Sequence, residues 1–246
     1  MQTGRIEVHT HLLPAVDDGC ETYAQSLQCA ESLAGAGYTH VFCTPHLWPS
    51  LPRNKPRQIA DWVAEFQLRL DAAAINLQAL PGGEINLADL WPRMEEWPAE
   101  EIATFGNAGK YALFDFWSDD PTIVATRIEP AVQHLLSLGI TPILAHPERI
   151  GATNKHPAVL DRLTDLGVML QLNAWCLAHP PSSAAQTTAL RLLHEGRYFL
   201  IGADLHRPDG FEGHVEGLAE AAKIVGEAEL AKLCVENPRL LLPPTA

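Results

Sequence analysis

Short apolar runs alternate with longer segments of helical periodicity along almost the whole chain. The runs are rich in Val, Ile, Leu, Phe and Tyr and are nearly continuous in apolar character, which is typical of strands buried on both faces of a parallel sheet. The pattern predicts seven strands, at residues 5–9, 39–43, 76–80, 111–116, 140–145, 167–172 and 198–202.

The intervening segments predict helices at residues 22–36, 55–74, 122–138, 156–166, 183–195 and 214–233. Several end at a glycine before the next strand, as helices commonly do, at Gly37, Gly139, Gly167 and Gly196. Repeated strand–helix units predict an α/β fold, either an open doubly wound sheet or a closed barrel. No long linker interrupts the pattern, so we expect one domain over residues 1–246.

Two connections are unusually long and carry Pro and Trp, at residues 44–57 and 86–109. Long connections in compact domains are often functional, so we expect both to cover a site. Trp48 and Trp117 follow predicted strands and are the aromatic residues best placed to line its pocket.

Composition narrows the classes of function. The formal net charge is -13 and no basic cluster of five or more residues occurs, which argues against nucleic acid and anionic membranes as partners. The five cysteines form no C-x-x-C pair and are odd in number, which favours a reducing compartment over a disulfide framework. The first residues lack an apolar signal core, and no apolar run is long enough to cross a bilayer. We therefore expect a cytoplasmic location.

Imidazole or carboxylate side chains follow six of the seven predicted strands. Ligands of parallel α/β folds bind outside the carboxyl ends of the strands, so these side chains are predicted to share one rim. His9 and His11 alternate along the first strand and therefore share a face. Asp17 and Asp18 come next, in a pattern that alone most often marks a turn. The later candidates are His46, Glu84, Asp115, His146, Arg149, Asp204 and His206.

Nitrogen and oxygen donors without sulfur suit divalent ions such as Zn, Mn and Fe. A carboxylate such as Glu84 can bridge two ions, and clustered ions can clamp the oxygens of a displacement at phosphorus. Each of these motifs alone is weak evidence for a metal site. Because donor side chains follow six of the seven predicted strands, the motifs together predict one. The remaining histidines, His214 among them, are expected to be surface or packing residues.

Several motifs occur in an order that resembles the polymerase-and-histidinol-phosphatase (PHP) family. Within it, the chain is similar to the capsule-type bacterial protein-tyrosine phosphatases. The resemblance runs nearly end to end and rests on "VHTHLLPAVDDG", "CTPH", "GGEI", "AHPER", "GADLH" and the closing "ENPRLLL".

The resemblance implies a distorted, TIM-like (β/α)7 barrel holding three divalent metal ions. Mn is the usual metal, and Fe or Zn also fit the donors. Three ligand groups are implied. They are His9, His11, Glu84 and Asp204 for the first ion; Glu84, Asp115 and His146 for the second; and Asp18, His46 and His206 for the third.

The implied activity is hydrolysis of phosphotyrosine on a tyrosine kinase of capsule or exopolysaccharide biosynthesis, by attack of a metal-bound hydroxide at phosphorus. Arg149 is the expected catalytic contact to the phosphate oxygens. No cysteine is followed six positions later by arginine, as thiolate-dependent tyrosine phosphatases require, so a metal must supply the chemistry.

Three positions depart from the family pattern. Glu7 replaces the usual Asp and is expected to support a ligand histidine. Asp115 replaces the usual Glu and is shorter by one methylene, so we expect it to bind the second ion more weakly. Phe211 stands near an expected arginine, and Arg207 is the candidate to replace that substrate-binding cation.

Three alternatives remain from the sequence. One is a phosphatase acting on a small molecule, such as a histidinol-phosphate-like compound or a nucleotide. Another is an amidohydrolase-like C–N hydrolase, which also opens its barrel with H-x-H; the paired Asp204 and His206 argue against it. The last is a non-catalytic metal-binding module.

Overall fold

The computed structural model describes residues 4–91, 93–178 and 183–244. All its strand pairings are parallel, in two sheets of order β1-β2-β4 and β3-β5-β6-β7-β8-β9. The strands are β1 (Arg5–Thr10), β2 (Tyr38–Cys43), β3 (His46–Leu47), β4 (Gln78–Pro81), β5 (Glu84–Asn86), β6 (Tyr111–Asp115), β7 (Thr141–Ala145), β8 (Met169–Asn173) and β9 (Tyr198–Gly202).

The two sheets form one distorted barrel. The chain passes from β2 directly into β3 and from β4 into β5, and the bond from Glu84 N to Pro45 O, at 3.1 Å, joins these extensions. A parallel bridge between Thr10 and Leu205 joins the ends of the first and last strands. The seven predicted strands are therefore confirmed, and the barrel alternative holds. Two short strands that were not predicted, β3 and β5, extend the second and third strands after a break.

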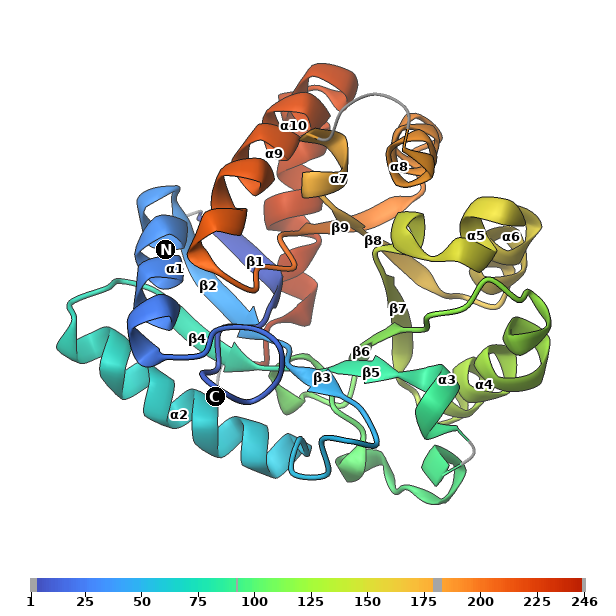
Figure 1. The fold of residues 1–246 in the computed structure, drawn as a ribbon, viewed down its shortest axis with the longest axis horizontal. Helices are drawn as coiled ribbons and strands as arrows, with labels where there is room; N and C mark the ends of the chain where they lie inside the picture. Colours follow the sequence, from blue (N-terminus) through green and yellow to red (C-terminus); the bar gives the residue numbers. More distant parts are fainter. Residues whose placement is uncertain (1–3, 92, 179–182, 245–246) are drawn as a thin grey trace.

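Helices surround the strands on the outside of the barrel (Figure 1). They are α1 (Tyr23–Gly35), α2 (Pro56–Ala72), α3 (Leu87–Leu90), α4 (Glu129–Ser137), α5 (Gly151–Lys155), α6 (Ala158–Asp165), α7 (Trp175–Ala178), α8 (Ala184–His194), α9 (Phe211–Val225) and α10 (Glu227–Ala231). The side-chain oxygens of Thr22 and Ser183 accept backbone hydrogen bonds at the starts of α1 and α8, which fixes where those helices begin. None of the helices in the described ranges is both long and apolar enough to span a bilayer.

Some helix boundaries differ from the prediction. The helix expected at 156–166 is preceded by a separate short helix, α5, and the chain turns at Pro157 before α6. The helix expected at 214–233 ends at Val225, because Gly226 breaks it and α10 follows. The four predicted glycine stops all have positive φ, as a helix C-terminus of this kind requires.

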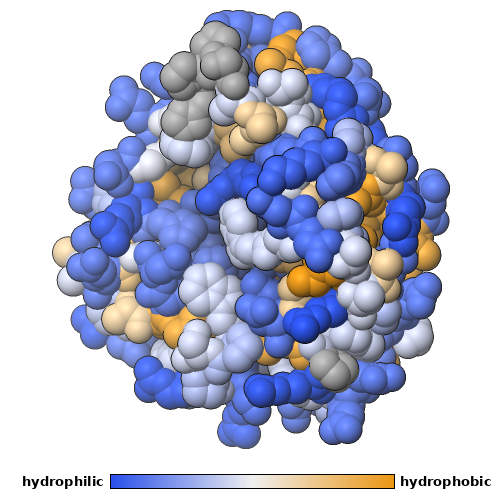
Figure 2. Space-filling view, turned by 45° about the vertical axis from the view of Figure 1, so that its right-hand side comes forward, coloured by the Kyte–Doolittle hydropathy of each residue, from blue (hydrophilic) through white to orange (hydrophobic). Residues whose placement is uncertain are grey.

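The apolar core has two layers. One lies inside the barrel, where Val8, Phe42, Leu113, Ile143 and Leu200 pack together. The larger layer lies between the strands and the surrounding helices. The outer surface is mostly hydrophilic on the face that Figure 2 shows, with apolar residues in separated patches. The apolar filling of the barrel leaves its polar side chains to collect at the carboxyl ends of the strands.

His214 of α9 is a buried packing residue, as predicted. Its Nε2 lies 2.6 Å from Tyr38 Oη, and burial lowers the pKa of His214 from 6.5 to about 3. The native state therefore keeps this ring neutral, whereas the unfolded chain binds a proton below pH 6.5. Its contribution to stability is complete above that pH and is lost as the pH falls toward 3.

We expect His214→Gln to flatten the acid side of the stability curve. Between pH 7 and 5 the free energy of unfolding of the metal-free wild-type protein should fall by about 2 kcal/mol more than that of the variant. Urea unfolding at both pH values measures this. His194→Gln, at an exposed histidine of α8, is the matched control, and an equal pH dependence in all three proteins would contradict the assignment.

Candidate metal centre

The nine predicted donors lie together at the carboxyl ends of the strands. In the first group, His9 and His11 leave β1 with their Nε2 atoms 3.3 Å apart. Asp204 Oδ1 lies 3.3 Å from both of these nitrogens, and Glu84 Oε2 lies 3.3 and 3.6 Å from them. Four lone-pair donors from three distant segments thus face one point.

Glu84 also links this group to the next strands. Its Oε1 lies 2.8 Å from His146 Nε2, and its Oε2 lies 2.9 Å from His46 Nδ1. Donor atoms of His46, Glu84 and Asp115 lie within 4.8 Å of one another. The carboxylate of Glu84 is therefore central to the cluster, with one oxygen directed to each side. The structure places Asp115 nearest to His46 and Glu84, and groups His146 with His9 and Asp204.

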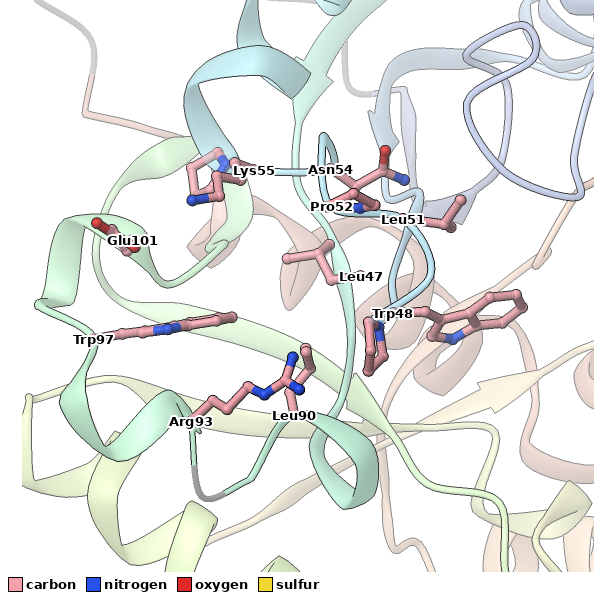
Figure 3. A pocket seen from close by; sticks show the side chains of 12 residues that line it. Leu47, Trp48, Leu51, Pro52, Asn54, Lys55, Leu90, Arg93, Trp97 and Glu101 are labelled. Atoms are coloured by element: carbon pink, nitrogen blue, oxygen red, sulfur yellow. The ribbon is translucent and has the colours of Figure 1, made fainter.

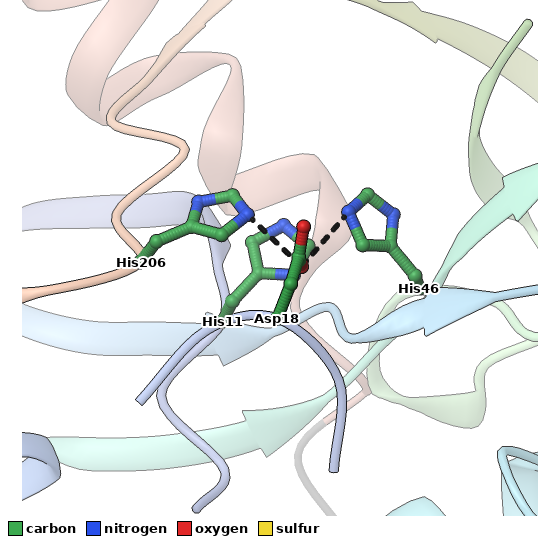
Figure 4. A group of neighbouring side chains, drawn as sticks. All are labelled: His11, Asp18, His46 and His206. Carbon is green, nitrogen blue, oxygen red and sulfur yellow. Dashed lines mark ion pairs between the residues drawn. The ribbon is translucent and has the colours of Figure 1, made fainter. Parts of the chain in front are cut away.

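The third group lies at the outer edge of the cluster and is shown in Figure 4. Asp18 Oδ1 lies 3.4 Å from the Nε2 atoms of both His46 and His206. His11 belongs to this group as well, with its ring stacked 3.9 Å from that of His206. The Asp18 side chain is 56% exposed, so this end of the cluster opens to solvent.

The electrostatics of the cluster call for cations. Among the described residues, neither oxygen of Asp115 has a hydrogen-bond partner, and the buried Glu84 Oε2 and Asp204 Oδ1 have imidazole nitrogens as their close neighbours. Burial, reinforced by the charge of Glu84, raises the pKa of Asp115 well above its ordinary range. Burial also opposes ionisation of Glu84, but the charge of His9 and the bond from His146 hold its pKa well below the usual value. Buried carboxylates this close together are stable only when paired or bound to metal, so the donor set fits divalent ions.

Two of the nine donors have strained backbones. His146 and Asp204 have φ angles of +34° and +50°, in the left-handed region that residues other than glycine rarely adopt. Such a conformation costs about 1–3 kcal/mol and typically persists where a function requires it. Here it turns each side chain back over the end of its strand and into the cluster.

Supporting residues orient the donors, and the sequence reasoning missed most of them. Asp17 Oδ2 lies 2.7 Å from His11 Nδ1, which directs the Nε2 of that ring toward the cluster. Gln171 Oε1 lies 2.9 Å from His9 Nδ1 and acts in the same way. Asn173 donates to Asp204 Oδ2 at 3.2 Å. The Asp17–Asp18 pair was the available signal for the first of these; a glutamine or asparagine within a strand gives none.

Glu7 contacts the backbone of a donor residue, not its ring. Its Oε1 accepts hydrogen bonds from His9 N at 2.9 Å and from Ala203 N at 2.8 Å. It therefore fastens β1 to the segment that leads into Asp204. Gly19 serves a similar purpose in the loop after β1, since a Cβ there would lie 2.2 Å from His11 O.

A cavity of about 560 Å³ adjoins the cluster, and Asp204, His206, Arg149 and Arg207 line it. The Arg149 guanidinium forms an ion pair with Asp204 and lies 5.3 Å above the ring of Trp117. The sequence also allowed an ion pair between Arg149 and either Glu148 or an acid at the barrel rim, and Asp204 is such an acid. Arg207 is 55% exposed and lies 3.4 Å from Glu21, at the outer edge.

Comparison with known proteins gives a consistent result. A family model described as "Capsular polysaccharide synthesis, CpsB/CapC" matches residues 5–243. The tyrosine-protein phosphatase YwqE of Bacillus subtilis is 29% identical, over 96% of this chain and 91% of the relative. The tyrosine-protein phosphatase CpsB of Streptococcus pneumoniae is 25% identical, over 96% of this chain and 98% of the relative.

Solved structures are similar over the same extent. One, from crystal structures of YwqE from Bacillus subtilis and CpsB from Streptococcus pneumoniae described as metal-dependent tyrosine phosphatases, has a TM-score of 0.84 and 27% identity, covering 96% of this chain and 94% of the other. A TatD homologue from Escherichia coli has a TM-score of 0.50 and 15% identity, covering 98% and 99%. The second likeness concerns the fold alone.

Proposed function

This chain belongs to the CpsB/CapC family of capsular polysaccharide synthesis, and from that membership and its cluster of nine donors we infer that it is a metal-dependent protein-tyrosine phosphatase. The observation that carries the inference is the convergence of buried imidazole nitrogens and carboxylate oxygens within 4.8 Å of one another, a donor set that divalent cations would satisfy. The PHP-type resemblance predicted from the motifs agrees with this family.

We propose that three ions occupy the cluster and that Mn is the metal. His9, His11, Glu84 and Asp204 would hold the first, and the groups around Asp115 and around Asp18 the others. Three divalent ions carry six positive charges against the four carboxylates of the cluster, which leaves a site attractive to a phosphate dianion in a protein of net charge -13. When bound, such ions supply a nucleophile from water at neutral pH and stabilise the phosphoryl oxygens.

The protein's own residues would bind and orient the phosphotyrosine. Arg149 presents a planar fork beside the cluster, suited to two phosphate oxygens, and Trp117 supports it from below. Trp117 and Trp175 are 46% and 41% exposed, so their faces are accessible to the phenyl ring of the substrate. Arg207 lies farther out, where it would contact the protein that carries the phosphotyrosine.

The physiological setting is also a proposal. We propose that the substrate protein is a tyrosine kinase of polysaccharide assembly, as the motif resemblance implies, and the family's role in capsular polysaccharide synthesis supports that setting. All five cysteines are buried and unpaired in the structure, which suits the reducing cytoplasm. Because the family model spans residues 5–243, and Ile6 and Leu241 near the two ends of that range both pack in the core inside the barrel, we propose a single domain over 1–246.

The test is hydrolysis of p-nitrophenyl phosphate and of a phosphotyrosine peptide in Mn²⁺, with and without EDTA. Both should be hydrolysed, and EDTA should abolish both reactions. Arg149→Lys should lower kcat/KM by about 10²-fold, because it keeps the charge but loses the fork. Faster turnover of small phosphate esters such as nucleotides than of the peptide would favour a small-molecule phosphatase, and no phosphate release with metal bound would refute the proposal.

A further inference from the structure

The two long loops enclose a second cavity next to the metal centre. Its volume is about 200 Å³, and its walls are mainly apolar. Figure 3 shows Leu47 between Trp48 on one side and Trp97 on the other, with Leu51 and Pro52 on the neighbouring loop. We call this cavity the loop pocket; the residues that line it are Leu47, Trp48, Pro49, Leu51, Pro52, Asn54, Lys55, Pro56, Leu90, Arg93, Trp97 and Glu101.

The loop pocket adjoins the rim that carries the candidate metal ligands. Both of its loops leave the carboxyl ends of strands that carry proposed ligands, one after His46 of β3 and the other after Glu84 of β5. The ring of Trp48 stacks 4.1 Å from that of His46 and so separates the pocket from the cluster by a single indole. An extended peptide advances about 3.3 Å per residue, so a residue close to the phosphotyrosine would reach the pocket.

Size and chemistry limit what can occupy the loop pocket. A drug-sized ligand or a nucleotide needs roughly 300–1,000 Å³, whereas 200 Å³ suits one or two side chains. The walls favour an apolar side chain. The charged residues of the lining, Lys55, Arg93 and Glu101, are all exposed, and the amide of the buried Asn54 already donates to the backbone oxygens of Val16 and His46.

We propose that the loop pocket receives a large apolar side chain of the substrate protein, close in sequence to the phosphotyrosine. This proposal rests on the proposed phosphatase function and extends it to a specificity-determining site. The apolar walls would accept an acidic side chain less well than an apolar one, because a carboxylate seated against them loses its water. A small substrate such as p-nitrophenyl phosphate has no neighbouring residues and would not use the pocket.

The experiment compares kcat/KM for phosphotyrosine peptides in which one residue, at each of the three positions before and after the phosphotyrosine, is Leu, Ala or Asp. At one or more positions the wild-type protein should prefer Leu over Ala by about tenfold. Leu51→Glu should abolish that preference and leave p-nitrophenyl phosphate hydrolysis within about twofold. Leu51 lies in a surface loop and is only partly buried, so the variant should fold.

Leu68→Glu is the matched control, because Leu68 lies on α2, is 69% exposed and does not line the pocket. It should leave the preference for Leu intact. Equal kcat/KM for Leu and Ala peptides at every position, or a preference that survives in Leu51→Glu, would overturn the pocket assignment alone. Failure to hydrolyse p-nitrophenyl phosphate as well would refute the proposed function, and the pocket proposal with it.

Discussion

Replacing Glu84 with glutamine is expected to lower kcat/KM for a phosphotyrosine peptide by at least about 10³-fold. The two Glu84 oxygens lie between 2.8 and 3.6 Å from ring nitrogens of His9, His11, His46 and His146. Glutamine keeps the shape, but it removes a negative charge and places an N–H donor where a lone pair is needed. Bound metals supply several kcal/mol of transition-state stabilisation. A loss of about 4 kcal/mol of that stabilisation corresponds to a decrease in kcat/KM of about 10³-fold.

Elemental analysis of the purified variant distinguishes the cause of this loss. We expect fewer metal ions per chain than in the wild-type protein, since one carboxylate contacts donors from several groups. Glu65→Gln makes the same chemical change at an exposed position of α2 and should alter neither metal content nor turnover. A Glu84→Gln protein with full metal content and kcat/KM within tenfold of the wild type would show that Glu84 does not organise the cluster.

Removing the metals should also lower the stability of the fold. A site held at 100 times its dissociation constant stabilises the native state by about 2.7 kcal/mol. In a chain of 246 residues each kcal/mol shifts Tm by about 2–4 °C, so chelation should lower Tm by roughly 5–10 °C for each fully bound site. Calorimetry in Mn²⁺ and in EDTA measures this shift.

Asp115→Asn provides an internal check on that prediction. Both oxygens of Asp115 are buried without partners among the described residues, so a charge on this side chain destabilises the native state of the metal-free protein. The variant should be more stable than the wild type in EDTA, yet gain less stability from added Mn²⁺. If metal loss is measured but Tm does not change in either protein, the buried carboxylates cannot depend on cations as we infer.

Much of the fold was predictable from the sequence because burial on both faces makes each strand a continuous apolar run. The breaks within the second and third strands were not, since Pro45 and the Gly82–Gly83 pair leave the apolar pattern intact on either side. Likewise, helix periodicity continues through Gly226, and only the three-dimensional packing reveals that α9 ends before it.

The donors of the candidate centre were predictable from the sequence, whereas the residues that support them were mostly not. The nine donors follow strands directly, so parallel topology alone brings them to one rim, although their role as ligands remains a prediction. Gln171 lies within a strand and carries no charge, so nothing in the sequence distinguishes it from a packing residue. The two long connections and Trp48 were expected at a site, but the form of the loop pocket could not be foreseen, because the sequence does not reveal the shapes of the connections that carry Leu51 and Trp97.

The bridge between Thr10 and Leu205 has a consequence for how the protein matures. The first donor is residue 9 and the last is residue 206, and that bridge brings their strands together. A chain still emerging from the ribosome lacks Asp204 and His206 until synthesis is nearly complete, so its first and third groups of donors are incomplete until then. Binding of the proposed ions would therefore be completed late in synthesis, and a chain cut short before β9 would lack two of the nine donors however well its first half had folded.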